Sequence, residues 1–586
     1  TAYPAGPAFD ATKTHRLGIE IRGQAPISSN GIFDFVPAGG APLFTRNIVD
    51  NDTCNACHDI FEFHGGPRTD ITYCVTCHNP SSIDGDTAAQ PWGGTVDMKR
   101  MVHKIHYGEN LANGYFIIGF GGSVHDYSNI VFPQDVRNCQ TCHQESDPNT
   151  PQASNWRLVA NRDTCGSCHD DIDFAAGGHP GGFVFNDDTQ CLDCHGPTAT
   201  VNNGDARIDV AHALLEQQAA EAFEYQVVSV TNSGPGQTPS ATIRVLNPTD
   251  PDYAADPLST AYDINDPTGP FQTGGARLRL DMSWTTTALG NVDPNNDLGR
   301  SPTSGAPFAP IVIDFSSGAT NDGTNTFTKA ADVAIPTGIT GSGLAALEGR
   351  AAVDIGGELD NIPVESAVLA FAITDANARS RRSIVDISKC NDCHQNLALH
   401  GDSRAGNTAL CSTCHNPNAT DINRRVAGSE CDMELGLDDE TIDFKRMVHG
   451  IHSGNIGVCG YRNTAHSYFG LVYPGKLNNC EGCHLANTYY PVDPTVVPAT
   501  TVDAGADRSR LIDDVAISPN TSVCSSCHTS SLAAQHMIQN GGDFTAGKDE
   551  TGAIISSGVE TCQLCHGPGR SADVKEMHGV GEFQFN

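Results

Sequence analysis

The sequence is poor in aromatic residues, in basic residues and in long apolar runs. Only 7% of its 586 residues are aromatic, and 34 Lys or Arg stand against 69 Asp or Glu, which gives a formal net charge of −35. That balance argues against nucleic acid as a partner, because nucleic-acid-binding proteins carry basic faces. No apolar window reaches the 18 residues of a transmembrane helix. Thr1 begins no recognisable signal peptide, so we expect the numbering to begin after processing or truncation.

Cysteine, in contrast, is abundant and regularly spaced. Twenty of the 22 Cys fall in ten C-x-x-C-H pentads, the attachment signature of c-type haem. Structural zinc sites need no His after each C-x-x-C pair, and thioredoxin-like chemistry needs one such motif instead of ten. We therefore expect ten covalently bound haem c groups, and because these are attached outside the cytoplasm we expect an exported protein.

The predicted haem thioether residues are the two cysteines of each pentad: Cys54, Cys57, Cys74, Cys77, Cys139, Cys142, Cys165, Cys168, Cys191, Cys194, Cys390, Cys393, Cys411, Cys414, Cys480, Cys483, Cys524, Cys527, Cys562 and Cys565. The predicted proximal iron ligands are the pentad histidines: His58, His78, His143, His169, His195, His394, His415, His484, His528 and His566.

The pentads belong to a repeat. The segment DMKRMVHKIH at 97–106 returns as DFKRMVHGIH at 443–452, and each copy lies within five pentads in the same order. Met98, Met101, Val102 and Ile105 follow helical spacing, so they predict the core face of an amphipathic helix. His103 and His106 are three residues apart on one flank of that helix, where we expect them to bind two different haems.

The predicted fold class is multidomain, with two pentahaem c-type cytochrome modules of little regular secondary structure separated by an all-β domain, a sandwich or Greek-key barrel. Residues 1–50 carry two strand-like runs and are interpreted as a short β segment or the remnant of a β domain. Residues 51–215 form the first pentahaem module, 216–386 the all-β domain and 387–586 the second module. Haem macrocycles would supply the apolar core that the modules lack.

Thirteen histidines lie outside the pentads, and twelve of them occur in matching places in the two modules. We expect them to provide bis-His ligation, since Met, the rival sixth ligand, is rare here. Six candidates for five irons leave one surplus histidine per module, and His125 and His466 are the preferred surplus pair. His15 stands outside the scheme, as a surface residue or a ligand to a neighbouring chain. The predicted distal ligands are His64, His103, His106, His179, His212, His400, His449, His452, His536 and His578, with His125 and His466 less certain.

Two cysteines, Cys431 and Cys459, belong to no pentad. In an exported protein, two remaining cysteines predict a disulfide. This one would close an insert, CDMELGLDDET, that the first module lacks.

The chain resembles the outer-membrane decahaem cytochromes of metal-reducing bacteria, the MtrC/OmcA family, through MVHKIHYG, CVTCHNP, CSTCHNP and CHGPGRSADVKEMH. The resemblance implies alternating β and pentahaem domains, haems in a crossed chain, and a place on the cell surface or outside the cell. It also implies electron delivery to metal oxides, flavins or other soluble shuttles, with other cytochromes or an outer-membrane porin–cytochrome conduit as partners. The first β domain is nearly absent here. The close Cys pair that members carry in a β domain is missing, so flavin binding is not implied.

Three functions compete. The first is an electron conduit with no enzymatic activity of its own, in which any metal reduction is outer-sphere electron transfer. The second is a subunit of a polymeric cytochrome wire, assembled head to tail. The third is a multihaem reductase, which needs an iron with a vacant position, whereas here all ten pentads end in His and distal candidates outnumber irons.

Overall fold

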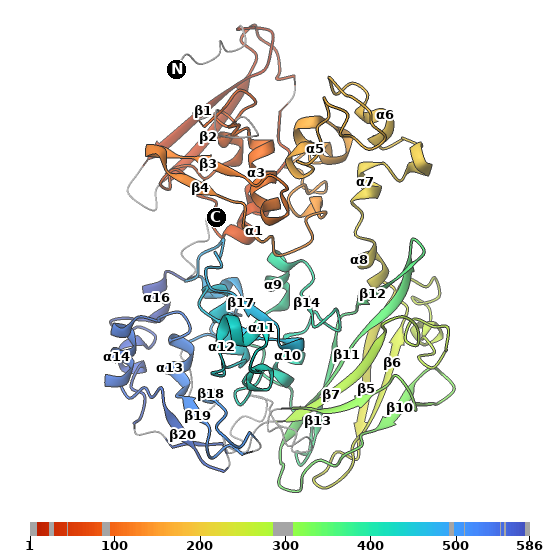
Figure 1. Ribbon diagram of the computed structural model, residues 1–586, viewed down its shortest axis with the longest axis vertical. Helices are drawn as coiled ribbons and strands as arrows, with labels where there is room; N and C mark the ends of the chain where they lie inside the picture. The colour runs from red at the N-terminus through yellow and green to blue at the C-terminus, as the bar shows by residue number, and fades with distance from the viewer. Residues whose placement is uncertain are drawn as a thin grey trace. The chain divides into compact units, whose positions relative to one another are not determined.

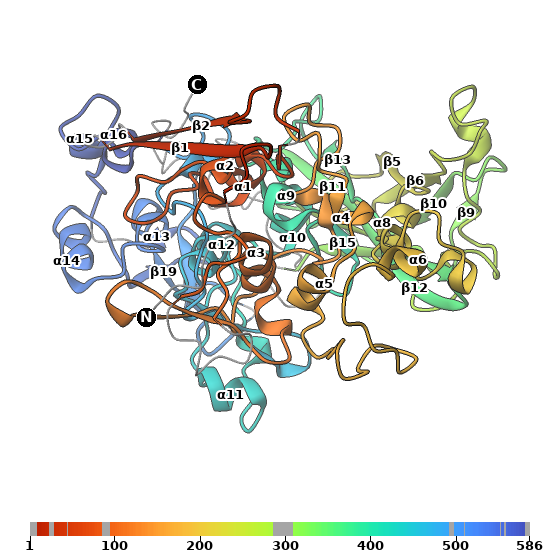
Figure 2. The ribbon, with the colours of Figure 1, turned by 90° about the horizontal axis from the view of Figure 1, so that it is seen from above.

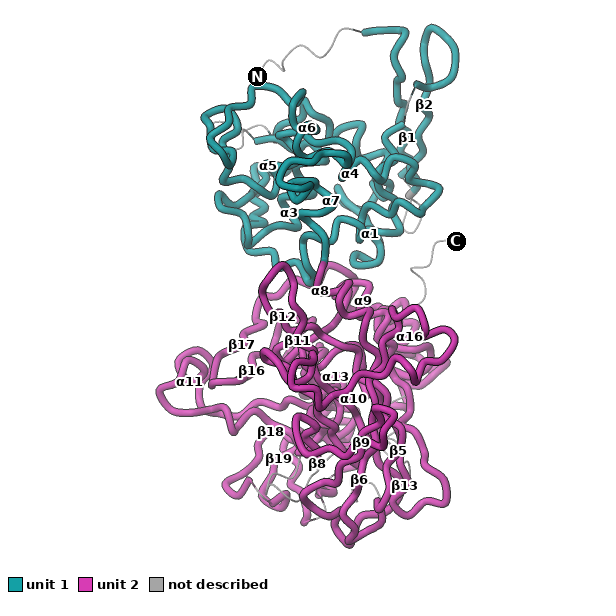
Figure 3. Tube along the Cα trace, turned by 90° about the vertical axis from the view of Figure 1, so that its right-hand side faces the viewer, with its two compact units in different colours: residues 1–214 teal, residues 215–586 magenta. Residues whose placement is uncertain are grey.

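The computed structural model divides the chain into two units, residues 1–214 and 215–586 (Figure 3). It describes residues 9–22, 28–43, 45–84, 94–284, 309–490, 497–508, 510–550, 552–555 and 558–580. The division into four segments with boundaries at residues 50, 215 and 386 stays a prediction.

The first unit begins with an antiparallel ribbon of two strands, β1 (His15–Arg22) and β2 (Ser28–Phe35) (Figure 2). Both strands were predicted, and both are confirmed. Gly18 lies against α2 (Ile71–Cys74), where a Cβ on Gly18 would come within 2.8 Å of the Tyr73 ring. Leu17, Ile19 and Ile21 point to the opposite face and are 52%, 55% and 57% exposed. Strand alternation therefore gives the ribbon one docked face and one apolar face that solvent reaches.

The rest of the first unit consists of short elements joined by turns, as predicted. Several helices begin at a pentad because an acidic or amide side chain caps them: Asp50, Asp70 and Asn161 each accept a hydrogen bond from a backbone N–H of the first turn. The elements are α1 (Asn51–His58), α2, α3 (Met98–Tyr107), β3 (Phe116–Ile118), β4 (Val124–Asp126), α4 (Asn155–Leu158), α5 (Arg162–Cys168), α6 (Cys191–His195) and α7 (Ile208–Ala211).

Helix α3 is the first copy of the repeated segment, and its burial differs from the prediction. The predicted apolar stripe is only half-buried, whereas Lys104 is 1% exposed. Its ammonium forms an ion pair with Asp170, with 3.3 Å between Nζ and Oδ2, and lies 5.9 Å from the centre of the Tyr115 ring. A charge is buried only where it is paired, so helical spacing alone was a poor guide to this face.

The second unit opens with α8 (Leu215–Ala220) and a β sandwich (Figure 1). One sheet has the order β5-β6-β10-β9, and the other has the order β12-β11-β7-β8, with β13 also paired to β11. The strands are β5 (Glu224–Thr231), β6 (Ser240–Leu246), β7 (Arg277–Trp284), β8 (Ile311–Asp314), β9 (Thr320–Asn321), β10 (Phe327–Ala330), β11 (Ser342–Ile355), β12 (Glu358–Pro363) and β13 (Ala367–Ala372). The strand runs predicted between 216 and 386 are confirmed.

Side chains from both sheets enclose one apolar core. Ile243 of β6, Leu280 of β7 and Leu347 of β11 are completely buried in it. The opposite face of β7 and β11 carries Asp281 and Glu348, which are also buried. That polar face packs against α10 (Thr408–Cys414), the helix of the pentad 411–415. The sandwich thus has an apolar core between its sheets and buried charged residues on the outer face of β7 and β11.

The remainder of the second unit repeats the short elements of the first. They are α9 (Ile387–His394), β14 (Ala398–Leu399), β15 (Arg404–Ala405), α10, α11 (Glu430–Leu435), α12 (Phe444–His452), β16 (Gly457–Cys459), β17 (Ala465–Ser467), β18 (Thr500–Asp503), β19 (Val515–Ile517), α13 (Pro519–Cys524), α14 (Ser531–Gln539), β20 (Ala546–Lys548), β21 (Ile554–Ile555), α15 (Gln563–His566) and α16 (Val574–His578). The four-stranded sheet β18-β19-β20-β21 was not predicted. Within the described ranges, every helix is too short or too polar to cross a bilayer.

A disulfide joins Cys431 of α11 to Cys459 of β16, 28 residues apart in sequence. Both cysteines are buried, and α11 also packs against β16 and β17. The covalent link therefore closes the insert that distinguishes the second module from the first.

Replacing Cys431 and Cys459 by Ser should loosen this insert, because a disulfide that closes a loop of this length contributes about 3–4 kcal/mol in the chain-entropy model. We expect faster amide hydrogen exchange in peptides covering α11, β16 and β17, measured by mass spectrometry. Peptides of the sandwich serve as the control and should exchange at the parent rate. Unchanged exchange in the insert would contradict the stapling role.

Candidate haem-binding sites

The ten pentads leave their cysteines available for attachment. All twenty pentad cysteines lie in the described ranges, and none of them forms a disulfide. Each pentad lies at or beside a short helical turn, which brings its two sulfurs and its histidine to one side of the backbone. This local geometry is the one that covalent haem attachment requires.

In the first unit, each pentad histidine faces one histidine from outside the pentads. The ring centroids are 5.9 to 6.3 Å apart in all five pairs. The pairs are His58 with His106, His78 with His64, His143 with His103, His169 with His212, and His195 with His179.

The second unit repeats the same five pairings. Centroid separations are again 5.9 to 6.2 Å. The pairs are His394 with His452, His415 with His400, His484 with His449, His528 with His578, and His566 with His536. The structure thus brings together all ten proximal and all ten principal distal candidates named from the sequence.

The separation of the rings fits an iron between them. A metal–imidazole nitrogen bond is about 2 Å long, so two such bonds across one metal span about 4 Å, and each ring centre lies roughly one bond length further back. Centroids of two axial imidazoles therefore fall near 6 Å apart, which is the observed spacing. Direct packing of two imidazole rings would not require the same spacing ten times at interplanar angles from 25° to 90°.

Hydrogen bonds at Nδ1 hold many of these rings in the tautomer that binds metal. His78 and His415 each have Nδ1 at 2.9 Å from a backbone carbonyl, that of Val96 in one unit and that of Ile442 in the other. An imidazole that donates from Nδ1 keeps the lone pair on Nε2 for a metal. The other rings with a carbonyl acceptor at Nδ1 are His106, His179, His195, His212, His452, His566 and His578.

Burial favours the neutral form of the paired histidines. Desolvation lowers the pKa of His143 and His484 to about 4, and it lowers the pKa of His400 and His449 to about 4 as well. Neutral imidazole is the form that coordinates iron, so burial keeps these side chains in the form that can bind a metal.

The two repeated helices each supply two rings to different partners. On α3, His103 faces His143 and His106 faces His58. On α12, His449 and His452 face His484 and His394 in the same way. Because these histidines are three residues apart on one helix, the helix sets the separation of two neighbouring sites.

The remaining three histidines face no pentad histidine. The Nε2 atom of His125 lies 3.0 Å from Ser123 Oγ, and that of His466 lies 3.4 Å from Thr464 Oγ1. His15 Nε2 lies 2.9 Å from the carbonyl oxygen of Asp10. In all three rings a protein atom therefore lies beside Nε2, the nitrogen that an imidazole donating from Nδ1 leaves available for a metal. A hydroxyl residue two positions before His125 and His466 is a sequence signal that would have separated them from the ligand candidates.

Neighbouring thiols reveal which pentads lie close together. Burial, followed by the nearby thiol of Cys142 and, to a smaller extent, that of Cys74, raises the pKa of Cys54 to about 11. After burial, Cys139 has the largest effect on the pKa of Cys168, and Cys165 is also among the causes that raise the pKa of Cys191. In the first unit the pentads are thus neighbours in the order second, first, third, fourth and fifth.

The second unit gives the same series from its own sulfurs. The pKa of Cys390 is raised by burial and then by Cys483 and Cys411. Burial followed by Cys562 raises the pKa of Cys524, and Cys527 lies close enough to raise the pKa of Cys480. Two modules of different sequence therefore share one order of attachment sites, which the sequence alone did not reveal.

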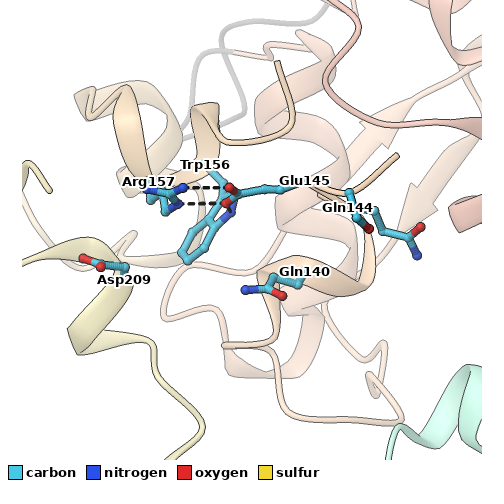
Figure 4. A pocket seen from close by; sticks show the side chains of 7 residues that line it. Gln140, Gln144, Glu145, Trp156, Arg157 and Asp209 are labelled. Atoms are coloured by element: carbon cyan, nitrogen blue, oxygen red, sulfur yellow. Dashed lines mark hydrogen bonds and ion pairs between the residues drawn. The ribbon is translucent and has the colours of Figure 1, made fainter. Parts of the chain in front are cut away.

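A polar cavity of about 480 Å³ lies beside the third pentad of the first unit (Figure 4). Its lining includes Gln140 and Trp156, and Arg157, which donates two hydrogen bonds to Glu145 at 2.8 and 2.7 Å. No histidine lines this cavity, and its charged groups include a satisfied ion pair. It therefore offers no imidazole to a metal.

A family model for outer membrane cytochromes, MtrC/MtrF-like, domains II/IV, matches residues 46–212 and 382–579. The chain belongs to this family. It is 26% identical over 573 residues to the multiheme cytochrome MtrC of Shewanella baltica strain OS185, an alignment that covers 93% of this chain and 73% of that protein.

Two solved structures share the fold of this MtrC/MtrF-like chain. The outer membrane decaheme cytochrome OmcA superposes with a TM-score of 0.66 at 20% identity, covering 97% of this chain and 80% of the other. MtrC from Shewanella baltica OS185 superposes with a TM-score of 0.61 at 21% identity, covering 95% and 82%. The chain is accordingly a multihaem c-type cytochrome of electron transport, with haem c as its cofactor.

The contrast between paired and unpaired histidines can be tested with one substitution on each side. Replacing His103 by Met should alter the absorption spectrum of one haem and raise its reduction potential, because a thioether ligand favours the reduced iron. Replacing His125 by Met should leave every haem unchanged. Spectroelectrochemical titration of both variants measures this. A silent His103→Met variant, or a shifted haem in the His125→Met variant, would contradict the geometry.

Proposed function

We propose that this MtrC/MtrF-like chain is a decahaem electron conduit. Ten c-type haems, each held between two histidines, carry electrons through the protein to acceptors outside the cell. The observation that supports this most strongly is the set of ten imidazole pairs at one spacing, with the same five pairings in both units.

The residues of the chain have three tasks in this proposal. The pentad cysteines would hold the macrocycle by two thioether bonds, and the paired imidazoles would bind its iron. The carbonyls of Val96 and Ile442 fix the ring orientation of His78 and His415. When bound, the haem supplies one-electron redox chemistry; the protein sets its position and its potential.

The order of the attachment sites supports a continuous path within each module. Neighbouring sulfurs connect the pentads in the series second, first, third, fourth, fifth in both units. The first pentad and the third are linked again by α3 and α12, each of which supplies a histidine to both sites. We infer that electrons follow this series.

Full axial occupancy argues against the reductase hypothesis. An enzyme that binds nitrite or a similar substrate at iron needs one iron with an open position, and here each of the ten pentad histidines faces a second imidazole. We therefore propose outer-sphere transfer to metal oxides, flavins or other shuttles. The net charge of −35 favours cationic and metal-containing acceptors over anionic ones.

We propose other cytochromes or a porin–cytochrome conduit of the outer membrane as electron donors, with the protein at the cell surface.

The filament remains a second candidate. The observation that favours it is the exposed apolar face of β1 and β2, with Leu17, Ile19, Ile21 and Phe33, because exposed apolar patches mark contact surfaces. Electron microscopy of the native material decides between the two: discrete particles without filaments would exclude the wire.

Haem content and spin state test the conduit directly. We expect an intact mass that corresponds to ten haems, uptake of ten electrons in a reductive titration, and electron paramagnetic resonance spectra of low-spin iron alone. Reduced protein should not bind carbon monoxide, and a suspension of iron(III) oxide should reoxidise it. A high-spin haem or carbon monoxide binding in the parent protein would contradict full axial occupancy.

A further inference from the structure

The second pentad of each module pairs with a histidine that sits in an unusual loop. His64 and His400 have φ angles of 55° and 58°, in the left-handed region that side chains other than glycine disfavour. Each loop is closed by antiparallel pairing of the residues around it, Phe63 with Arg68 and Leu399 with Arg404. A disfavoured backbone persists only where its surroundings hold it, so something must restrain these loops.

In the first unit, the β ribbon restrains the loop of His64. Arg68, the last residue of the loop, donates from Nε to Oε2 of Glu20 on β1 at 2.9 Å. Arg22 binds the other oxygen of the same carboxylate, and Asn30 of β2 donates to the carbonyl of Pro67 at 3.0 Å. Hydrogen bonds from Arg68 and Arg22 lower the pKa of Glu20 to about 2, so the carboxylate stays charged at neutral pH.

In the second unit, the sandwich restrains the loop of His400 through the corresponding residues. Arg404 binds both carboxylate oxygens of Glu348 on β11. The next residue on that strand, Gly349, donates its N–H to the carbonyl of Ser403 at 2.8 Å, and Arg350 binds the carbonyl of Gly401. Glu348 is completely buried and also accepts from Arg277 at 2.9 Å.

The two restraints also resemble each other in sequence. The run Ile19-Glu20-Ile21-Arg22 corresponds to Leu347-Glu348-Gly349-Arg350, with the apolar residues on the opposite face of the strand in both cases. Each arginine also lies near the second cysteine of the pentad that its loop serves, Cys77 for Arg68 and Cys414 for Arg404. A carboxylate on a β strand, an arginine, a distal histidine and an attachment site thus recur as a unit.

We propose that Glu20 and Glu348 are positioning residues: by fixing Arg68 and Arg404 they hold His64 and His400 on the irons of the pentads 74–78 and 411–415. The proposal rests on the ligation proposed above. It assigns the β ribbon and the sandwich a specific role, which is to keep two sixth ligands in place. When the carboxylate is lost, the loop relaxes toward ordinary backbone angles and the histidine leaves the iron.

The strength of the two restraints should differ. The side chains of Glu20 and Arg68 are 12% and 28% exposed, whereas that of Glu348 has no exposure. Loss of an exposed ion pair changes an equilibrium by about two- to fivefold, and loss of one partner of a buried pair changes it by a hundredfold or more, on the order of magnitude of measured cases. The open population of the His400 site should therefore rise far more than that of the His64 site.

The test uses the full haem-loaded protein with Glu20→Ala and Glu348→Gln, the second being nearly isosteric. The matched controls are Glu109→Ala, an exposed carboxylate of the first unit, and Glu358→Ala on the exposed turn end of β12. The readouts are carbon monoxide binding to the reduced protein, the high-spin signal of the oxidised protein, and hydrogen exchange of residues 60–70 and 396–406. Added imidazole serves as a replacement ligand.

We expect carbon monoxide to bind one haem in the Glu348 variant, to bind the matching haem only fractionally in the Glu20 variant, and to bind none in the controls, with faster exchange confined to the matching loop. Imidazole should restore the low-spin spectrum, because it replaces the displaced side chain. Glu variants that stay low-spin with parent exchange rates would overturn the proposal. Loss of one haem from the intact mass would also overturn it, because the carboxylates would then be needed for haem attachment instead of for positioning the ligand. Carbon monoxide binding by the parent protein would instead refute the underlying ligation.

Discussion

Two imidazole rings about 6 Å apart, repeated ten times, are the constraint on which the rest of the two modules depends. Between residues 45 and 214 the buried hydrophobic side chains in the described ranges are Ile71, Leu111, Tyr115, Ala153 and Ala160. Such a set cannot offset a backbone ordering cost of about 1–2 kcal/mol per residue. Haem, the cofactor of this family, would supply the missing free energy in residues 45–214, so folding of this segment would depend on haem. The sandwich differs, since it has an apolar core of its own.

The two modules share this framework but differ in the charges placed around it. Lys104 of the first module is buried against Asp170, next to the pentad histidine His169. The matching positions of the second module are Gly450 and Thr529, so the pair is absent there. A buried ammonium with its carboxylate creates a local field that neither neutral residue reproduces. Equivalent haems of the two modules can therefore have different potentials without any change of ligand.

The sequence predicted more of the candidate sites than of the fold around them. Pentads, distal candidates and strand runs follow local spacing, and the repeat made twelve histidines recognisable because each occurs in both modules. The sequence did not predict which distal histidine meets which pentad histidine. His143 meets His103 and His195 meets His179, and these contacts depend on how short loops close around a macrocycle. The predicted helix α3 is confirmed, but its predicted buried face is wrong. Lys104, which lies outside the predicted stripe, is buried because it forms an ion pair with a residue 66 positions away. Hydroxyls at Ser123 and Thr464 did carry a readable signal about the surplus histidines.

The ring orientations add a constraint that ligand identity alone does not contain. The pairs His64 with His78 and His400 with His415 have interplanar angles of 37° and 36°. The pairs made by His106 and by His452 are nearly perpendicular, at 82° and 74°. The two classes of site would therefore present different ring arrangements to the metal that they hold. The two modules reproduce these angles although their surrounding residues differ. The pairs with the smaller angles, 25° to 37°, are those whose distal loops are held by Arg68 and Arg404 and those made by His103 and His449.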